Sequence, residues 1–213
     1  MTDAYSARTS HAFVLTETVT IAELMYQGAT QEDIRQRVLV EDLFQLRSQV
    51  SRERALQIVL KRLRQVPAYI QLIATGNPDT RQLTILFLIL REHRLLRELI
   101  AEVLLDKIKG FDYVVTSADL RAFFEGKRDQ NSTVAAWSES TYKKVASNTV
   151  LVLVNGGLLQ STSSRGNYQI RAVPVPSALR QQLLADGLSH YLTLMLDVQS
   201  TAIALNTAST GSA

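Results

Sequence analysis

The sequence predicts an all-α protein with two helix-turn-helix units, the second followed by a small β-hairpin wing. Three observations support this prediction. Apolar residues recur at helical spacing along most of the 213-residue chain. Capping residues and glycines mark the starts and ends of successive helices. Near the C-terminus, residues 158–173 instead combine turn residues with alternating side chains, which is typical of paired strands.

The composition is that of a soluble globular protein. Hydrophobic residues make up 46% of the chain, enough to bury a core as one domain or two small ones. Cysteine is absent, which excludes disulfides, thiolate metal sites and cysteine nucleophiles, and fits a reducing compartment. The apolar run at residues 83–90 is bracketed by Arg81 and Arg91 and is too short to span a bilayer. We therefore expect a cytoplasmic protein without a membrane segment.

Three helices are expected in the first third of the chain. The first covers residues 16–27 and stops at Gly28. Thr30, with Asp33 three residues later, resembles a capping box and starts the second helix. Ser51 is expected to cap the third helix, which Pro67 ends. The second and third helices are predicted to form the N-terminal helix-turn-helix unit.

The third of these helices has an apolar face and a basic face. From Arg35 to Arg64, eight arginines and lysines stand against three acids, so the net charge of +3 conceals a local excess. Guanidinium groups suit phosphates and guanine edges, although a basic helix face is more often simply solvated. The candidate DNA-binding residues of this region are Arg35, Arg37, Arg47, Arg52, Arg54, Lys61 and Arg62.

The middle of the chain is predicted to form the centre of the fold. A turn at residues 76–78 precedes one or two helices over residues 80–109, which end at Gly110. Residues 83–90 are apolar all round, as in a buried helix. Residues 1–110 are therefore expected to form an N-terminal helical domain.

The expected C-terminal domain, residues 111–205, has a different pattern. Thr116 with Asp119 can cap a short helix through Phe124, and a polar loop is expected at residues 126–133. A helix from Ser138 or Ser140 to about Val154 is then stopped by Gly156 and Gly157. The wing hairpin and a packing helix over residues 177–198 follow, and residues 206–213 are expected to be disordered.

This C-terminal unit also carries candidate DNA contacts. On the helix that begins near Ser138, four polar residues fall on one face, where they would enter the major groove. Two arginines in or beside the hairpin could reach a phosphate or the minor groove. The candidates are Ser140, Lys143, Lys144, Ser147, Arg165 and Arg171. Units of this kind also serve as protein-docking modules, so an adaptor remains an alternative.

Signatures of an enzyme, a metal site or a cofactor site are weak. The three histidines are far apart in the sequence, so no helical metal-binding pair exists. Neither a Walker A sequence nor G-x-G-x-x-G occurs. Asp112 with Glu125 and Lys127 superficially resembles a metal-dependent nuclease set, but these residues fall at a predicted helix end and loop. We expect a protein that is not an enzyme and has no cofactor.

Several stretches, in their order along the chain, carry a family resemblance. They are Tyr5-Ser6-Ala7, Ile21-Ala22-Glu23-Leu24, Arg37-Val38-Leu39-Val40-Glu41-Asp42-Leu43 with Arg47-Ser48, and Ser138-Glu139-Ser140-Thr141-Tyr142-Lys143-Lys144. This order resembles the BrxA family, core proteins of bacterial BREX (bacteriophage exclusion) systems. The resemblance covers roughly Tyr5 to Val173, and none of its stretches is a catalytic fingerprint.

The resemblance implies a helical, monomeric protein that binds double-stranded DNA through a positive surface. Such a protein would act beside a methyltransferase, an ATPase and other BREX proteins that mark host DNA and block phage replication. Phosphate contacts predict low sequence specificity. An adaptor that binds other BREX proteins is the first alternative. A similarity suggested between this family and the antitermination factor NusB keeps RNA as the second.

Overall fold

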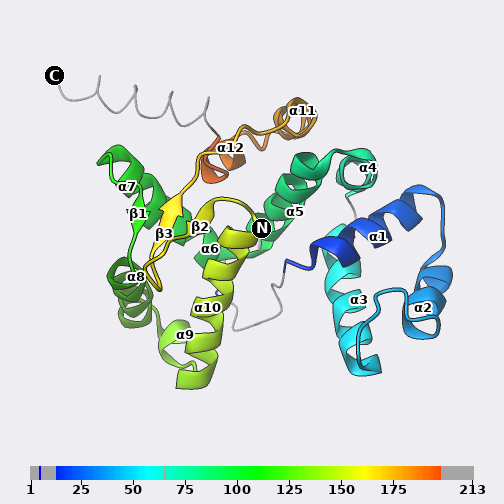
Figure 1. Ribbon diagram of the computed structural model, residues 1–213, viewed down its shortest axis with the longest axis horizontal. Coiled ribbons are helices and arrows are strands. Elements are labelled where there is room, and N and C mark those ends of the chain that lie inside the picture. Colours follow the sequence, from blue (N-terminus) through cyan, green and yellow to red (C-terminus); the bar gives the residue numbers. More distant parts are fainter. Residues whose placement is uncertain (1–4, 6–12, 65, 198–213) are drawn as a thin grey trace.

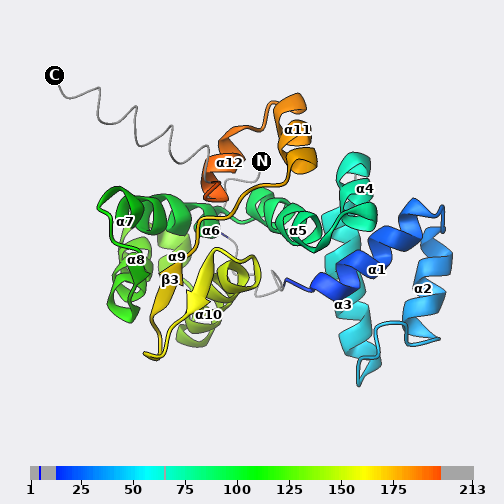
Figure 2. The same ribbon diagram turned by 45° about the horizontal axis from the view of Figure 1, so that its top comes forward.

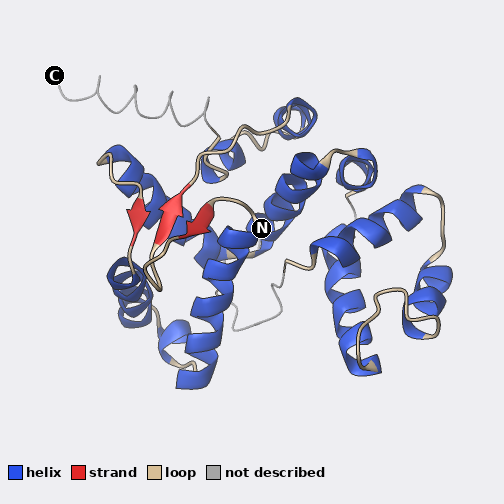
Figure 3. Ribbon diagram, viewed as in Figure 1, coloured by secondary structure: helices blue, strands red, loops and turns tan. Residues whose placement is uncertain are grey.

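The computed structural model describes Tyr5 and residues 13–64 and 66–197. Helices dominate, and a small antiparallel sheet lies in the C-terminal half (Figures 1 and 3). The mostly helical class predicted from periodicity is therefore confirmed, whereas the strands form a three-stranded sheet and not an isolated hairpin. The expected tail at residues 206–213 lies outside the described residues.

The N-terminal helices pack together at one end of the molecule (Figure 1). They are α1 (Leu15–Tyr26), α2 (Gln31–Leu39), α3 (Gln49–Leu63) and α4 (Pro67–Thr75). The capping box predicted for α2 is confirmed, because the Asp33 N–H donates to Thr30 Oγ1 at 3.1 Å and the Thr30 N–H donates to Asp33 Oδ2 at 3.0 Å. The cap of α3 was misplaced: Ser48 accepts from the Ser51 N–H at 3.2 Å. Pro67 begins α4, a helix that was not predicted.

The connection between α2 and α3 is a loop, as expected, and it is too long for the turn of a helix-turn-helix. It spans residues 40–48, whereas a helix-turn-helix joins its helices through three or four residues. Asp42 organises this loop from a left-handed conformation, with φ at +53°. Its carboxylate accepts from the Leu46 N–H at 3.1 Å and pairs with Arg52 at 3.0 Å. The loop is thus built by side-chain bonds, and its length is why an N-terminal helix-turn-helix is not confirmed.

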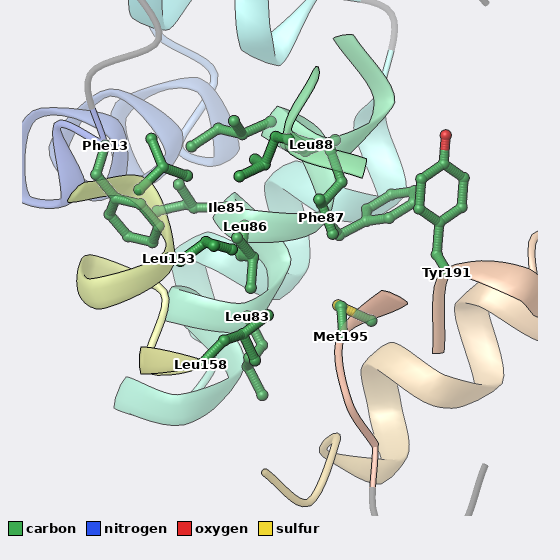
Figure 4. Close-up of a cluster of buried hydrophobic side chains, with 14 of the residues drawn as sticks. Phe13, Leu83, Ile85, Leu86, Phe87, Leu88, Leu153, Leu158, Tyr191 and Met195 are labelled. Atoms are coloured by element: carbon green, nitrogen blue, oxygen red, sulfur yellow. The ribbon is translucent and has the colours of Figure 1, made fainter. Parts of the chain in front are cut away.

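Helix α5 (Pro78–Glu92) is the buried centre of the fold, as its apolar run predicted. Its residues from Leu83 to Leu90 are all buried. Figure 4 shows Leu153 beside Leu86 and Leu158 beside Leu83, while Tyr191 and Met195 approach Phe87 from another element. The Tyr191 ring meets the Phe87 ring edge-on, with centroids 5.1 Å apart. One helix therefore holds both halves of the chain together (Figure 2).

The helical run after α5 is broken more often than predicted. His93 leaves helical geometry, and its Nδ1 accepts from the Leu96 N–H at 3.3 Å, which starts α6 (Arg94–Leu99). A π-helical turn, η1 (Ile100–Leu104), then leads into α7 (Leu105–Lys109). A π turn is rare and accommodates one extra residue within a helix.

Phe111, and not Gly110, takes the left-handed position that ends α7. Its φ is +56°, and the Asp112 N–H closes the end by donating to the Lys107 carbonyl at 2.9 Å. Glycine is normally favoured there because a Cβ is disfavoured in this conformation. Phe111 is also 80% exposed, so its ring gains little from burial. We therefore expect Phe111→Gly to raise the free energy of unfolding by about 0.5–1 kcal/mol in urea denaturation; a loss of stability would contradict this.

The first part of the C-terminal half, up to β3, combines a sheet with three helices. Its elements are β1 (Val114–Val115), α8 (Ser117–Gln130), α9 (Ser132–Ala135), α10 (Glu139–Asn155), β2 (Leu159–Ser161) and β3 (Tyr168–Ile170). The sheet order is β1-β3-β2, and both pairings are antiparallel. In register, Val115 lies opposite Tyr168, and Gln160 lies opposite Gln169. The predicted hairpin is thus confirmed as β2 and β3, with an additional strand beside it.

Two boundaries in this half were predicted wrongly. The helix capped by Thr116 runs to Gln130, so the expected loop at residues 126–133 is largely helical. The single packing helix is instead two, α11 (Ser177–Ala185) and α12 (His190–Leu194). Gly187, with φ at +69°, lies in the break. The expected end of that helix at residue 198 lies outside the described residues.

Candidate nucleic-acid interface

The exposed face of α10 holds four of the predicted contact residues. Ser138 caps the helix by accepting from the Thr141 N–H at 3.3 Å, which fixes where α10 begins. Helical spacing then places the predicted residues on one exposed face: Ser140, Lys143, Lys144 and Ser147. Lys143 has a single long ion pair to Glu139, 3.6 Å, and its side chain is 73% exposed. These side chains are therefore available to a partner.

The two predicted wing arginines are exposed on either side of β3. Arg165 lies in the β2–β3 turn beside Gly166, whose φ of +81° suits a tight turn. Arg171 follows β3, and its NH1 donates to Gln160 Oε1 at 2.9 Å. The Ser117 N–H donates to Asn167 Oδ1 at 3.3 Å, which ties the turn to the start of α8. The wing is thus held near the helices whose surface it would extend.

The basic residues of the N-terminal half differ in exposure and in ion pairing. Arg35, Arg37, Arg47 and Arg54 are exposed. Arg52 is half-buried and pairs with Asp42, so it supports the loop between α2 and α3. Lys61 pairs with Glu92 at 2.9 Å, although more than half of its side chain is exposed. A polyanion could reach the first four directly and Lys61 in competition with Glu92.

Arg62 was wrongly included among the predicted DNA contacts. It is buried, with 8% of its surface exposed, and its NH1 donates to the Phe13 carbonyl at 2.7 Å and to Thr18 Oγ1 at 3.1 Å. Burial lowers the pKa of this guanidinium to about 10. Its role is to tie the segment before α1 to α3, and it cannot contact a partner at the surface.

The two basic regions face the same edge of the molecule. In Figure 1 the N-terminal ends of α3 and α10 both point to the lower edge, with α10 in the left half of the view and α3 in the right half. Arg47 and Arg54 lie at or near the first of these ends, and Ser140 and Lys143 lie at the second. A helix N-terminus adds a partial positive charge to the cations beside it.

A groove between α8 and α10 was not predicted. It has a volume of about 580 Å³ and is lined mainly by apolar and aromatic side chains, including Leu120, Phe124, Tyr142 and Val150. Leu151 borders it with 52% of its surface exposed. Lys143 and Ser147 also line it, so the predicted contact face merges into an apolar surface. The signal in the sequence was the exposed leucine on the polar side of the helix.

A buried ionic network, also not predicted, positions α8. Lys127 is 7% exposed, and its Nζ lies 2.9 Å from Glu98 Oε2 and 2.6 Å from Glu102 Oε1. Glu98 further accepts from the Tyr5 hydroxyl and from Arg94 Nε, both at 2.7 Å. Lys127 is thus committed to α6 and η1, which removes it from the nuclease set considered above.

Neither a metal-binding cluster nor a membrane span is found in the part of the chain that the structure describes. Within these residues, histidine, aspartate and glutamate side chains never converge in groups of three at metal-binding geometry. No described helix combines the length and apolarity needed to cross a bilayer.

These features define a mostly helical protein with cationic surfaces on two separate helices. The chain belongs to the BrxA family, whose model matches residues 3–187. It is 24% identical over 188 residues to the BREX protein BrxA of Bacillus cereus (strain H3081.97), which covers 88% of this chain and 93% of that protein. The fold matches the crystal structure of an uncharacterized protein from Magnetospirillum magneticum, with a TM-score of 0.74 and 20% identity, covering 91% of this chain and 98% of the other.

Proposed function

We propose that this BrxA family member is a non-enzymatic, monomeric accessory protein of a BREX phage-defence system that binds double-stranded DNA with low sequence specificity. The observation that carries the proposal is the exposed face of α10 with Ser140, Lys143, Lys144 and Ser147. Cations and hydroxyls on one helix face suit phosphates and base edges. Phosphate contacts dominate in such a set, which accounts for the low specificity.

The order of elements around α10 supports the same proposal. A strand, α8, the short α9, α10 and an antiparallel hairpin follow one another, and β3 pairs with both β1 and β2. This is the order of a winged helix-turn-helix, in which α10 would be the recognition helix and the β2–β3 turn the wing. Arg165 and Arg171 would then flank the duplex. The family membership and the name of the Bacillus cereus relative supply the BREX context.

Reversing two charges on α10 tests the proposal. We expect Lys143→Glu combined with Lys144→Glu to weaken duplex binding by similar factors for unrelated sequences. Two lost phosphate contacts should reduce the log–log salt slope by about 1.8, since each contributes about 0.9. Fluorescence anisotropy of labelled duplexes between about 50 and 200 mM salt measures both quantities.

The matched control is Lys109→Glu, which reverses a charge at the exposed end of α7. It should leave the salt slope unchanged, while Lys143→Glu alone should lower it. An unaltered affinity in the double variant would remove α10 from the interface. Arg47→Glu with Arg54→Glu examines the α3 surface in the same assay. Stronger binding to RNA than to duplex DNA would favour the RNA-binding alternative.

The α8–α10 groove favours a second candidate, a protein adaptor. Its apolar lining and exposed Leu151 fit the non-polar face of a partner helix better than a phosphate backbone. Leu151→Glu should then abolish co-purification of other BREX proteins after nuclease treatment, with duplex affinity retained. Co-purification that disappears with nuclease alone would assign those associations to DNA.

A further inference from the structure

A small cationic hollow lies between the C-terminal turns of α3 and α5, at the opposite end of α3 from its basic N-terminal turn. Its volume is about 200 Å³. The lining residues are Lys61, Arg62, Arg64, Val66, Leu88, Arg91 and Glu92. The lining therefore carries four cations and a single carboxylate, in a chain whose net charge is only +3.

Several contacts hold this lining in place. Arg62 is fixed in the interior by the Phe13 carbonyl and Thr18, and with Val66 and Leu88 it forms a wall that is largely buried. The Lys61–Glu92 pair, 2.9 Å, links the two helices. Arg91 is half-buried, with its guanidinium carbon 5.8 Å from the centre of the Phe87 ring. These contacts hold Arg62, Lys61 and Arg91, while Arg64 lies exposed at the edge of the hollow.

The size and charge of the hollow select a ligand. Sites for complete small molecules usually occupy about 300–1,000 Å³, so this one suits a compact group. Guanidinium groups bind tetrahedral oxyanions in a bidentate manner, and phosphate is the common biological example. A second acid would be required for a cation, and the lining does not supply one.

We propose that this hollow binds a phosphate oxyanion through Arg64 and Arg91, with Lys61 at its rim. The site is separate from the α10 surface and does not depend on duplex binding there. The phosphate group can come from a free phosphate or diphosphate, or from a DNA backbone that passes over this end of α3. The two sources share the chemistry and are separated by the choice of probe.

Calorimetric titration with inorganic phosphate and with pyrophosphate tests the proposal. The buffer contains no phosphate, and sodium chloride holds the ionic strength constant. The whole chain should bind one anion in a saturable manner, and its melting temperature should rise with ligand concentration. Arg64→Gln and Arg91→Gln should each weaken binding about tenfold, because each loses a charge-assisted hydrogen-bonding pair. Arg91→Lys should not restore full affinity.

Lys109→Gln is the control and should bind phosphate as the unmodified chain does. Unliganded melting temperatures of all variants establish that they fold. Loss of phosphate binding in Arg64→Gln and Arg91→Gln with duplex affinity retained would support the proposal. Weakened duplex binding in these two variants without free-phosphate binding would identify the DNA backbone as the source of the phosphate. Absence of saturable phosphate binding together with unchanged duplex affinity in both variants would overturn the proposal.

Discussion

Lys127→Met is expected to lower the free energy of unfolding by about 3 kcal/mol, because it removes the buried cation that pairs with the carboxylates of Glu98 and Glu102. Glu98 would retain the Tyr5 hydroxyl and Arg94, but the link from α8 to α6 and η1 would be lost. For a chain of this length the melting temperature should fall by about 6–12 °C. Urea denaturation and thermal unfolding followed by circular dichroism measure the change.

Lys109→Met is the matched control for this variant. Lys109 also pairs with a carboxylate, Asp106, at 2.9 Å, but both side chains are more than half exposed. The control should change stability by less than about 0.5 kcal/mol. Equal effects of the two substitutions would mean that the network around Glu98 stabilises no more than a surface pair does.

The same network predicts how the stability difference between Lys127→Met and the unmodified chain depends on pH. Burial alone would raise the pKa of the Glu98 carboxyl, but hydrogen bonds from Tyr5, Arg94 and Lys127 hold it below its ordinary value. The two carboxylates likewise hold the pKa of Lys127 above its ordinary value despite burial. Glu98 contributes to the free energy of unfolding above a pH of about 4.3, and this contribution is lost as the pH falls below that value. Lys127 contributes below a pH of about 10.4, and its contribution is lost as the pH rises further. The stability difference from Lys127→Met should therefore be largest between these limits.

Leu86→Ala and Gly156→Ala should each destabilise the fold, and the double variant should lose less stability than the sum of the two single losses. Leu86 is fully buried, so its truncation should cost about 3 kcal/mol. A Cβ on Gly156 would lie 2.9 Å from Leu86 Cδ1 and 3.0 Å from the Val152 carbonyl, which should cost about 1–3 kcal/mol. Because Leu86→Ala removes the closer of these two contacts, the double variant should lose at least about 1 kcal/mol less than the sum.

Gly126→Ala on α8 is the control for that cycle. A Cβ there would meet nothing within 4 Å, so alanine should stabilise α8 by about 0.5–1 kcal/mol through helix propensity. Strict additivity of Leu86→Ala and Gly156→Ala would contradict the close approach of α10 to α5. The φ of Gly156 is −79°, which alanine adopts readily. The double-mutant cycle therefore measures the steric effect of the added Cβ and not backbone strain.

Local signals in the sequence predicted much of the fold. The capping boxes at Thr30 and Thr116 start helices where predicted, because such caps depend only on residues three apart. The buried run of α5 was equally clear. The break at His93 was missed because it depends on a side chain replacing a backbone partner, and β1 was missed because two residues carry no periodicity. The His93 cap is local, but histidine is not among the usual capping residues, whereas β1 is defined by its pairing with the distant β3.

The candidate interface could be predicted only in part. Helical spacing placed Ser140, Lys143, Lys144 and Ser147 on one exposed face, because that face depends on geometry alone. The prediction that Arg62 contacts DNA was wrong, because nothing near it in the sequence indicates that its guanidinium donates to the Phe13 carbonyl. The contribution of Tyr5 was likewise invisible, because its partner Glu98 is far away along the chain.

The central position of β3 constrains the order in which the chain can fold. Val115, in β1, is synthesised early in the C-terminal half. Its partner Tyr168 is synthesised only after α8, α10 and β2. Closing the sheet must therefore wait for contacts of long sequence separation, which form slowly. During synthesis α10 would emerge with its apolar side lacking the strands that complete the unit. The cationic wing is consequently among the last surfaces to be assembled, and a nascent chain that stops short of residue 170 lacks it.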